Sequence, residues 1–208
     1  MSDETNIEYY NQNADAFCEQ TWAVDMSELY RPFEAYVPPK ASILDVGCGA
    51  GRDALYFHEK GYDITAFDYS LELVKNAQAL TGLPILHRSF YEIDERNKYD
   101  GIWCCASLLH VPFDQLSDVL MRLVRALKIE GVAYLSFKYG DSMREHNGRI
   151  FTDLNEQSIR TYLTPLPVSI QKEWITEDQR PDRVERWLNV IIQKKDFLDD
   201  ASQCRMAD

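Results

Sequence analysis

Hydrophobic residues along the chain alternate between short continuous runs and helical spacing. The apolar runs that suit strands lie at residues 42–46, 62–67, 84–87, 99–105 and 132–137. Apolar side chains spaced three and four residues apart lie between these runs, at residues 52–60, 71–80 and 114–127. Because parallel strands need crossover connections, this alternation predicts an α/β protein: an open, mostly parallel sheet with helices on both faces, in three layers.

The two ends of the chain depart from this alternation. Mixed aromatic and aliphatic spacing between residues 8 and 35 predicts two short helices, which Pro38 and Pro39 end. After Tyr139 we expect a polar loop, a helix near residues 154–162 and then an antiparallel hairpin. The hairpin strands are residues 168–174 and 184–193. The predicted organisation is a helical cap (1–40), a core (41–194) with a seven-stranded sheet, and a loose acidic tail (195–208).

Composition and charge narrow the classes of function. The 208 residues and 45% hydrophobic content fit one globular domain. The 22 basic and 34 acidic residues give a net charge of −12, which repels phosphate backbones and anionic membranes. We therefore expect neither a nucleic-acid nor a membrane partner. The sequence has no long apolar run and starts without a basic or apolar leader, so we expect a cytoplasmic protein.

Cysteine spacing gives no sign of a metal site. The five cysteines contain no C-x-x-C pair of the zinc or thioredoxin kind. Cys104 and Cys105 are adjacent in an apolar run, with only His110 nearby as a further ligand. We expect reduced, structural thiols and no bound metal.

The segment that carries chemistry is the turn after the first strand. It places Gly47, Gly49 and Gly51 at every second position between a strand and a helix. Glycine is required where the backbone turns sharply or a ligand comes into contact with it, and ligands of open parallel sheets bind at this edge. A dinucleotide fingerprint would place its third glycine at position 52, which is Arg52. No Gly-Lys-Ser or Gly-Lys-Thr follows either, so a nucleoside fits better than a dinucleotide or a phosphate loop.

A carboxylate stands at the end of the second predicted strand. Asp68 follows the apolar run 62–67, where it could accept hydrogen bonds from both hydroxyls of a ribose. The glycine turn and Asp68 together predict a nucleoside site.

Residues 43–52, which include the string LDVGCGAGR, together with Asp68 resemble motifs I and II of class I S-adenosylmethionine-dependent methyltransferases. The likeness extends by pattern over about residues 41–139. Within that family, residues 51–57 and 61–68 are similar to the tellurite-resistance methyltransferase branch. The resemblance implies a Rossmann-like, seven-stranded sheet and S-adenosyl-L-methionine as cofactor, with S-adenosyl-L-homocysteine as product. It also implies methyl transfer to a small-molecule acceptor by in-line displacement.

The resemblance also assigns cofactor contacts. The residues matched to cofactor-binding positions are Asp45, Gly47, Cys48, Gly49, Gly51, Arg52, Asp68, Tyr69, Ser89, Phe90, Cys105 and Ala106. The glycine turn would line the methionine part, Asp68 the ribose and Tyr69 the adenine. Many members carry an Asp for the adenine amino group after the third strand, whereas this chain has Ser89 and Phe90 there. Cys105 and Ala106 match the motif under the reactive sulfonium.

Candidate catalytic and acceptor residues lie outside the cofactor motifs. Because the sulfonium is already a good leaving group, holding the two reactants in line supplies most of the acceleration. If the acceptor is a hydroxyl or an amine, His110, Tyr10 or Tyr139 could remove its proton, whereas a thiolate or chalcogen oxyanion needs no base. Trp22, Arg144 and Arg149 are candidate acceptor-binding residues, the two arginines for an anion.

Two other functions remain open at this stage. A regulatory subunit would bind S-adenosylmethionine without transferring its methyl group. A nicotinamide-dependent oxidoreductase is disfavoured by Arg52 and by the lack of a Tyr-x-x-x-Lys pair. The sequence leaves the acceptor and the oligomeric state open.

Overall fold

The computed structural model describes residues 2–178, 180 and 184–196. Its centre is a seven-stranded sheet in the order β3-β2-β1-β4-β5-β9-β8. The strands are β1 (Ser42–Val46), β2 (Asp63–Asp68), β3 (Leu86–His87), β4 (Tyr99–Cys104), β5 (Leu127–Lys138), β8 (Val168–Glu177) and β9 (Arg186–Lys194). The first five are parallel, and β9 pairs antiparallel with both β5 and β8. The predicted mostly parallel sheet with a C-terminal antiparallel hairpin is confirmed.

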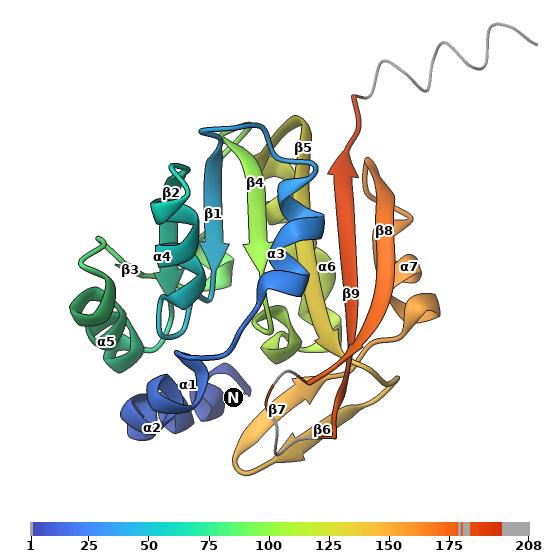
Figure 1. Cartoon of the computed structure of the whole chain (residues 1–208). Coiled ribbons are helices and arrows are strands. Elements are labelled where there is room, and N and C mark those ends of the chain that lie inside the picture. Colours follow the sequence, from blue (N-terminus) through green and yellow to red (C-terminus); the bar gives the residue numbers. More distant parts are fainter. Residues whose placement is uncertain (1, 179, 181–183, 197–208) are drawn as a thin grey trace, which may run out of the picture.

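Helices cover both faces of this sheet, which gives the expected three layers (Figure 1). The helices are α1 (Ser2–Gln12), α2 (Ala14–Thr21), α3 (Ser27–Glu34), α4 (Arg52–Glu59), α5 (Leu71–Thr81), α6 (Phe113–Ala126) and α7 (Glu156–Leu163), with 3-10 turns η1 (Phe90–Glu92) and η2 (Leu108–His110). On the α3 and α4 face, Phe33 and Phe57 pack on Trp103 of β4. On the other face, α6 and α7 bury Leu120 and Ile159 against the sheet.

The N-terminal region holds three helices where the spacing predicted two. A break falls between α2 and α3, where the Asp25 carboxylate accepts a hydrogen bond from Ser27 N at 2.9 Å. The two parts have different neighbours. Helix α3 buries Tyr30 and Phe33 against the sheet, whereas α1 and α2 pack on α5 and on β7. In Figure 1, α1 and α2 lie at the carboxyl ends of the parallel strands.

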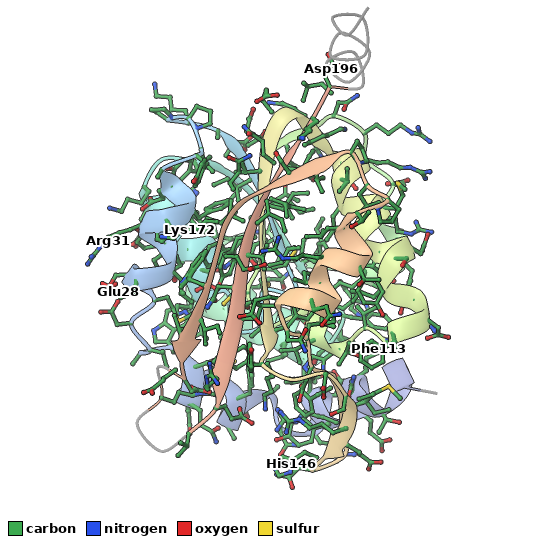
Figure 2. The ribbon with its side chains drawn as sticks, turned by 90° about the vertical axis from the view of Figure 1, so that its right-hand side faces the viewer. Glu28, Arg31, Phe113, His146, Lys172 and Asp196 are labelled. Atoms are coloured by element: carbon green, nitrogen blue, oxygen red, sulfur yellow. The ribbon has the colours of Figure 1, made fainter. Side chains whose placement is uncertain are left out.

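The segment after Tyr139 was predicted to be a loop, and that prediction is wrong. It forms an antiparallel hairpin of β6 (Met143–His146) and β7 (Arg149–Thr152). Asn147 and Gly148 turn it with φ of 53° and 70°. Asn-Gly is the preferred two-residue hairpin turn, so a signal was present in the sequence. Figure 2 shows His146 at the tip of this hairpin, at the opposite end of the molecule from Asp196.

Smaller differences concern the ends of elements. Strand β5 begins at Leu127, directly after α6, instead of at residue 132, and β3 is only two residues long. Of the expected acidic tail, Lys195 and Asp196 are described and residues 197–208 lie outside the described residues. Within the described ranges, no helix is both long and apolar enough to cross a membrane.

Candidate active site

The glycine turn between β1 and α4 lies at the carboxyl ends of the parallel strands. Gly47, Gly49 and Gly51 have φ of 71°, 55° and 81°, a left-handed conformation that favours glycine at each position. A Cβ on Gly47 would stand 2.7 Å from the Ser107 Cβ, and one on Gly49 would stand 2.9 Å from the Phe17 ring. The turn is therefore held close to the segment after β4 and to helix α2.

Gly51 has a packing role that the motif did not indicate. Its missing Cβ faces Thr81 at 2.9 Å and Ala77 at 3.2 Å, both on α5. Gly51 lines neither of the two cavities described next. Its absent side chain lets the start of α4 approach α5, so we remove Gly51 from the predicted cofactor contacts.

Two cavities lie on either side of the glycine turn. The larger cavity, of about 170 Å³, extends from the turn towards β5, β7 and the β8–β9 hairpin. The smaller cavity, of about 90 Å³, extends towards the ends of β2 and β3. Both are lined by Tyr10, Phe17, Gly47, Gly49, Ala106 and His110. A bent ligand lying over the glycine turn would reach both cavities.

Asp68 lines the smaller cavity and is fixed by main-chain donors. Its Oδ2 accepts a hydrogen bond from Gly49 N and its Oδ1 accepts one from Ser70 N, each at 2.9 Å. Burial raises the pKa of this carboxyl, and hydrogen bonds from the main-chain N–H groups of Ser70, Gly49 and Tyr69 oppose the rise. A carboxylate has about four lone-pair positions, so acceptor capacity is left for hydroxyl groups in the cavity.

The residues predicted to surround an adenine also lie in the smaller cavity. Tyr69, Ser89 and Phe90 line it together with Asn6 and Ile7 of α1. Ser89 forms a capping box with Glu92: its main-chain N–H donates to the Glu92 carboxylate at 2.7 Å, and its side chain accepts from the Glu92 main chain. The Tyr69 ring is 41% exposed and stacks on His87 at 6.0 Å, so it forms an open wall.

A buried polar network supports the other side of the turn. Asp53 accepts hydrogen bonds from Tyr30 Oη at 2.6 Å, from Trp103 Nε1 at 2.8 Å and from Arg52 Nε at 2.6 Å. Although burial opposes ionisation, the Arg52 guanidinium and these donors hold the pKa of Asp53 below its usual value. Arg52 also donates to the Thr21 carbonyl at 2.9 Å. Arg52 is therefore fixed at the wall of the larger cavity.

Asp45, by contrast, carries a carboxylate oxygen without a partner. It is 1% exposed and lines the larger cavity, and its Oδ2 has no hydrogen-bond partner among the described residues. Burial, and then the neighbouring Asp53, raise the pKa of Asp45 well above its usual value. An isolated buried carboxylate is costly, so this oxygen suits a cationic donor supplied by a ligand.

The segment after β4 forms the floor shared by both cavities. Ala106 has φ of 52°, uncommon for a residue with a Cβ, and its N–H donates to Ser136 Oγ at 2.7 Å. Such strained residues cluster at functional sites. Cys48 and Cys105 line the larger cavity, where burial raises the pKa of both thiols. Both thiols therefore stay protonated and contribute shape more than nucleophilicity.

Tyr10 and His110 form a hydrogen-bonded pair where the cavities meet. His110 Nδ1 lies 3.0 Å from the Ile150 carbonyl oxygen, which can only accept, so Nδ1 carries the proton. Nε2 is therefore the acceptor, and Tyr10 Oη donates to it at 2.8 Å. Burial lowers the pKa of His110 to about 4, and the cations of Arg149 and Lys138 add to this effect. The imidazole is neutral at pH 7.

Three predicted site residues lie outside both cavities. Trp22 packs against the small apolar cluster formed by α2 and α5. The Tyr139 hydroxyl donates to the Glu156 carboxylate at 2.9 Å, and the Arg144 guanidinium pairs with Asp153. We therefore remove these three residues from the site. Arg149 does line the larger cavity, as predicted for a residue that meets the acceptor.

The sequence did not reveal one wall of the larger cavity. That wall is lined by Lys138, Phe151, Thr176, Asp178, Arg180, Trp187 and Asn189. These residues come from β5 and the β8–β9 hairpin of the main sheet and from β7 of the separate two-stranded sheet. In the sequence, only Arg180 and Trp187, which lie beside the predicted hairpin turn, hinted that this hairpin could contact a ligand.

The described part of the chain contains neither a candidate metal site nor a disulfide. No group of three or more His, Cys, Asp or Glu residues there could hold a metal ion. Cys18, Cys48, Cys104 and Cys105 are free thiols, and Cys204 lies outside the described residues.

The chain matches methyltransferases in sequence. A family model described as a methyltransferase domain matches residues 43–131. A Bacillus subtilis (strain 168) protein named as a methyltransferase, YqeM, is 31% identical over 120 residues, which cover 52% of this chain and 48% of that protein. The ubiquinone biosynthesis O-methyltransferase of Rickettsia conorii is 31% identical over 102 residues, or 47% of this chain and 35% of that protein. The matches span less than half the length of these relatives.

Solved structures agree with the fold. The Burkholderia thailandensis 1,6-didemethyltoxoflavin-N1-methyltransferase, solved with 1,6-didemethyltoxoflavin and S-adenosylhomocysteine, has a TM-score of 0.74 and 23% identity. That match covers 91% of this chain and 85% of the other. The [4+2]-cyclase SpnF has a TM-score of 0.62 at 17% identity, covering 90% of this chain and 82% of the other. The fold therefore does not fix the reaction, and the sequence comparisons show that residues 43–131 are similar to a methyltransferase domain.

Proposed function

We propose that the protein transfers a methyl group from S-adenosyl-L-methionine to a small-molecule acceptor. The observation that carries the proposal is the pair of cavities beside the glycine turn, which share lining residues. One cavity presents the Asp68 carboxylate and the other presents the unpartnered Asp45 oxygen. S-adenosylmethionine is a nucleoside joined to an amino acid. Its ribose hydroxyls need an acceptor, which Asp68 would supply, and its ammonium group needs a second acceptor, which Asp45 would supply.

The residues present fit this cofactor. Asp68 would accept the ribose hydroxyls, and Tyr69, Ser89 and Phe90 would surround the adenine in the smaller cavity. In the larger cavity, Asp45 would receive the ammonium group and Arg52 the carboxylate of the methionine part, next to Cys48. Gly47, Gly49, Cys105 and Ala106 would line the middle. When bound, S-adenosylmethionine supplies a methyl group already activated on a sulfonium.

The chain's own contribution to the reaction is chiefly to hold and shield the acceptor. Holding the reactants in near-attack geometry can supply about 7–11 kcal/mol of the barrier. Helices α1 and α2 close the site: Asn6 exchanges two hydrogen bonds with the Ile150 main chain, at 2.8 and 3.4 Å. Asn11 of α1 accepts from the Oγ of Ser70, which lines the smaller cavity, at 2.7 Å. These contacts would hold α1 beside the place where the cavities meet.

The Tyr10–His110 pair would serve an acceptor that must lose a proton. Because the Nε2 lone pair of His110 already accepts from Tyr10, the acceptor's proton would pass to Tyr10 Oη while the phenolic proton passes to Nε2. The imidazolium so formed has a low pKa and returns its proton to water. An acceptor that is already an anion needs no such step.

Two experiments test the proposal. Calorimetry should show binding of S-adenosylmethionine and S-adenosylhomocysteine to the wild-type protein. Incubation with S-adenosylmethionine and a panel of phenols, thiols, small amines, selenite and tellurite should then form S-adenosylhomocysteine with at least one acceptor. The chalcogen oxyanions are included because of the short similarity to the tellurite-resistance branch. Absence of cofactor binding would refute the proposal, whereas binding without any methyl transfer would favour the regulatory subunit.

A further inference from the structure

Arg149, at the start of β7, stands out among the cations of the larger cavity. Its guanidinium lies over three aromatic rings, with centroid distances of 4.4 Å to Tyr9, 5.1 Å to Phe151 and 5.9 Å to Tyr10. Its Nε is buried and has no hydrogen-bond partner among the described residues. No carboxylate in that part of the chain forms an ion pair with it, which leaves hydrogen-bonding capacity for a ligand.

The other cations of this cavity are each neutralised by a carboxylate. Arg52 pairs with Asp53 at 2.6 Å, and Lys138 pairs with Glu185 at 2.5 Å. Arg180 makes a two-pronged contact with Asp178, with distances of 2.9 and 2.7 Å. Among the described residues, Arg149 is therefore the cation of the cavity that no carboxylate pairs with, and its Nε–H has no acceptor.

The charge of Arg149 acts on two neighbouring titratable groups, Lys138 and His110. Burial lowers the pKa of Lys138, and the charges of Arg144 and Arg149 lower it further, against the Glu185 carboxylate. The pKa of His110 falls for the same reasons, first burial and then Arg149 and Lys138. The whole chain carries −12, so an anion bound in this cavity would depend on the Arg149 charge to offset the overall field.

Aromatic rings form part of the wall of the larger cavity. Phe17, Tyr134, Phe151 and Trp187 line the same cavity, together with the Tyr10–His110 pair. Flat apolar surfaces around one oriented cation suit an unsaturated organic body that carries a negative group at one end. An inorganic or fully aliphatic anion could pair with Arg149 but would not stack on the aromatic side chains.

We propose that the methyl acceptor is a small aromatic organic anion, and that Arg149 binds its negatively charged group and sets specificity for it. The inference rests on the proposed function. The anionic group would lie against β7, which places the body of the acceptor between Arg149 and the glycine turn, beside Tyr10. Arg149 is an acceptor-binding residue here, whereas Arg144, which pairs with Asp153 outside both cavities, is not.

The test uses the wild-type protein saturated with S-adenosylhomocysteine. Benzoate and benzamide have the same ring and differ in charge, so they are compared at constant ionic strength, with selenite as an inorganic anion. At about ten times its dissociation constant, benzoate should raise Tm by roughly 3–6 °C, and benzamide and selenite should raise it much less. Benzoate should also raise the pKa of His110 in an NMR titration, because it neutralises the neighbouring cation.

Substitutions then test whether Arg149 is the residue that binds the carboxylate of benzoate. Arg149→Gln should abolish both effects of benzoate, and Arg149→Lys should keep part of the Tm shift. The control is Arg186→Gln, since Arg186 also lies over a ring, that of Tyr139 at 4.5 Å, but lines neither cavity. It should respond like the wild type. Equal responses to benzoate and benzamide, no response to either, or a full benzoate response in Arg149→Gln would overturn the inference. If S-adenosylhomocysteine fails to stabilise the wild type, the proposed function fails instead.

Discussion

Replacing Gly47 by alanine tests how closely the glycine turn is packed. Gly47 has φ of 71°, and a Cβ there would stand 2.7 Å from the Ser107 Cβ and 3.4 Å from the Phe90 ring. Gly82 offers a matched control, because its φ is 70° and nothing lies within 4 Å of the Cβ position. The two substitutions share the backbone strain and differ in the clash.

The expected costs follow from these two contributions. A residue with a Cβ in the left-handed region costs about 1–2 kcal/mol, which is the whole effect expected for Gly82→Ala. Overpacking adds about 1–3 kcal/mol, so Gly47→Ala should cost about 2–5 kcal/mol. For a domain of this size each kcal/mol lowers Tm by roughly 2–4 °C. Gly47→Ala should therefore unfold at a clearly lower temperature than Gly82→Ala.

Chemical denaturation of the two variants measures the difference. A double variant with Ser107→Gly removes the atom that the new Cβ would meet, so it should recover about 1–3 kcal/mol of the loss from Gly47→Ala. Because Gly47 and Ser107 both line the smaller cavity, S-adenosylhomocysteine should also bind more weakly to Gly47→Ala. Equal destabilisation of Gly47→Ala and Gly82→Ala, with no recovery in the double variant, would refute the close approach.

Two further predictions concern titrating groups in the cavities. The raised pKa of Asp45 means that the folded protein holds a proton that the unfolded chain releases, so this group makes the protein less stable as pH rises above the ordinary Asp value. A bound ammonium group favours the ionised form of Asp45, so the affinity for S-adenosylhomocysteine should weaken as pH falls. In calorimetry, the affinity of Asp45→Asn should depend less on pH than that of the wild type. NMR should find His110 protonated on Nδ1 with a pKa of about 4, so its contribution to stability is lost as pH falls from about 6.5 towards 4. Tyr10→Phe removes the donor to Nε2 and should raise that pKa; an unchanged value would contradict the assigned pair.

The central sheet was predictable because its signals are local. Each of the runs 42–46, 62–67 and 99–105 is bounded by turn residues, and each lies within two residues of an observed strand end. The hairpin of β6 and β7 was missed because its strands are short and largely polar. These strands have no clear hydrophobic periodicity, although the Asn147–Gly148 pair could have predicted the turn.

The sequence predicted the parts of the site where the backbone conformation or a main-chain hydrogen bond requires a particular residue type. The glycine turn and Asp68 follow from φ and from hydrogen bonding close to the turn. Tyr139 and Arg144 lie outside both cavities and pair with Glu156 and Asp153 through tertiary contacts that no spacing encodes. The pairing of Tyr10 with His110, 100 residues apart, was likewise invisible as a contact, although each residue was a candidate by itself.

The most direct measurement is the affinity of S-adenosylhomocysteine for Asp68→Asn, with Asp63→Asn as control on the same strand. Asp63 is exposed at the far end of β2 and lines neither cavity, so its variant should bind like the wild type. Hydrogen bonds to a charged group contribute about 1.5–3 kcal/mol, so Asp68→Asn should bind about 10- to 100-fold more weakly. A folded Asp68→Asn protein with wild-type affinity would contradict the proposal that this carboxylate holds the ribose of the cofactor.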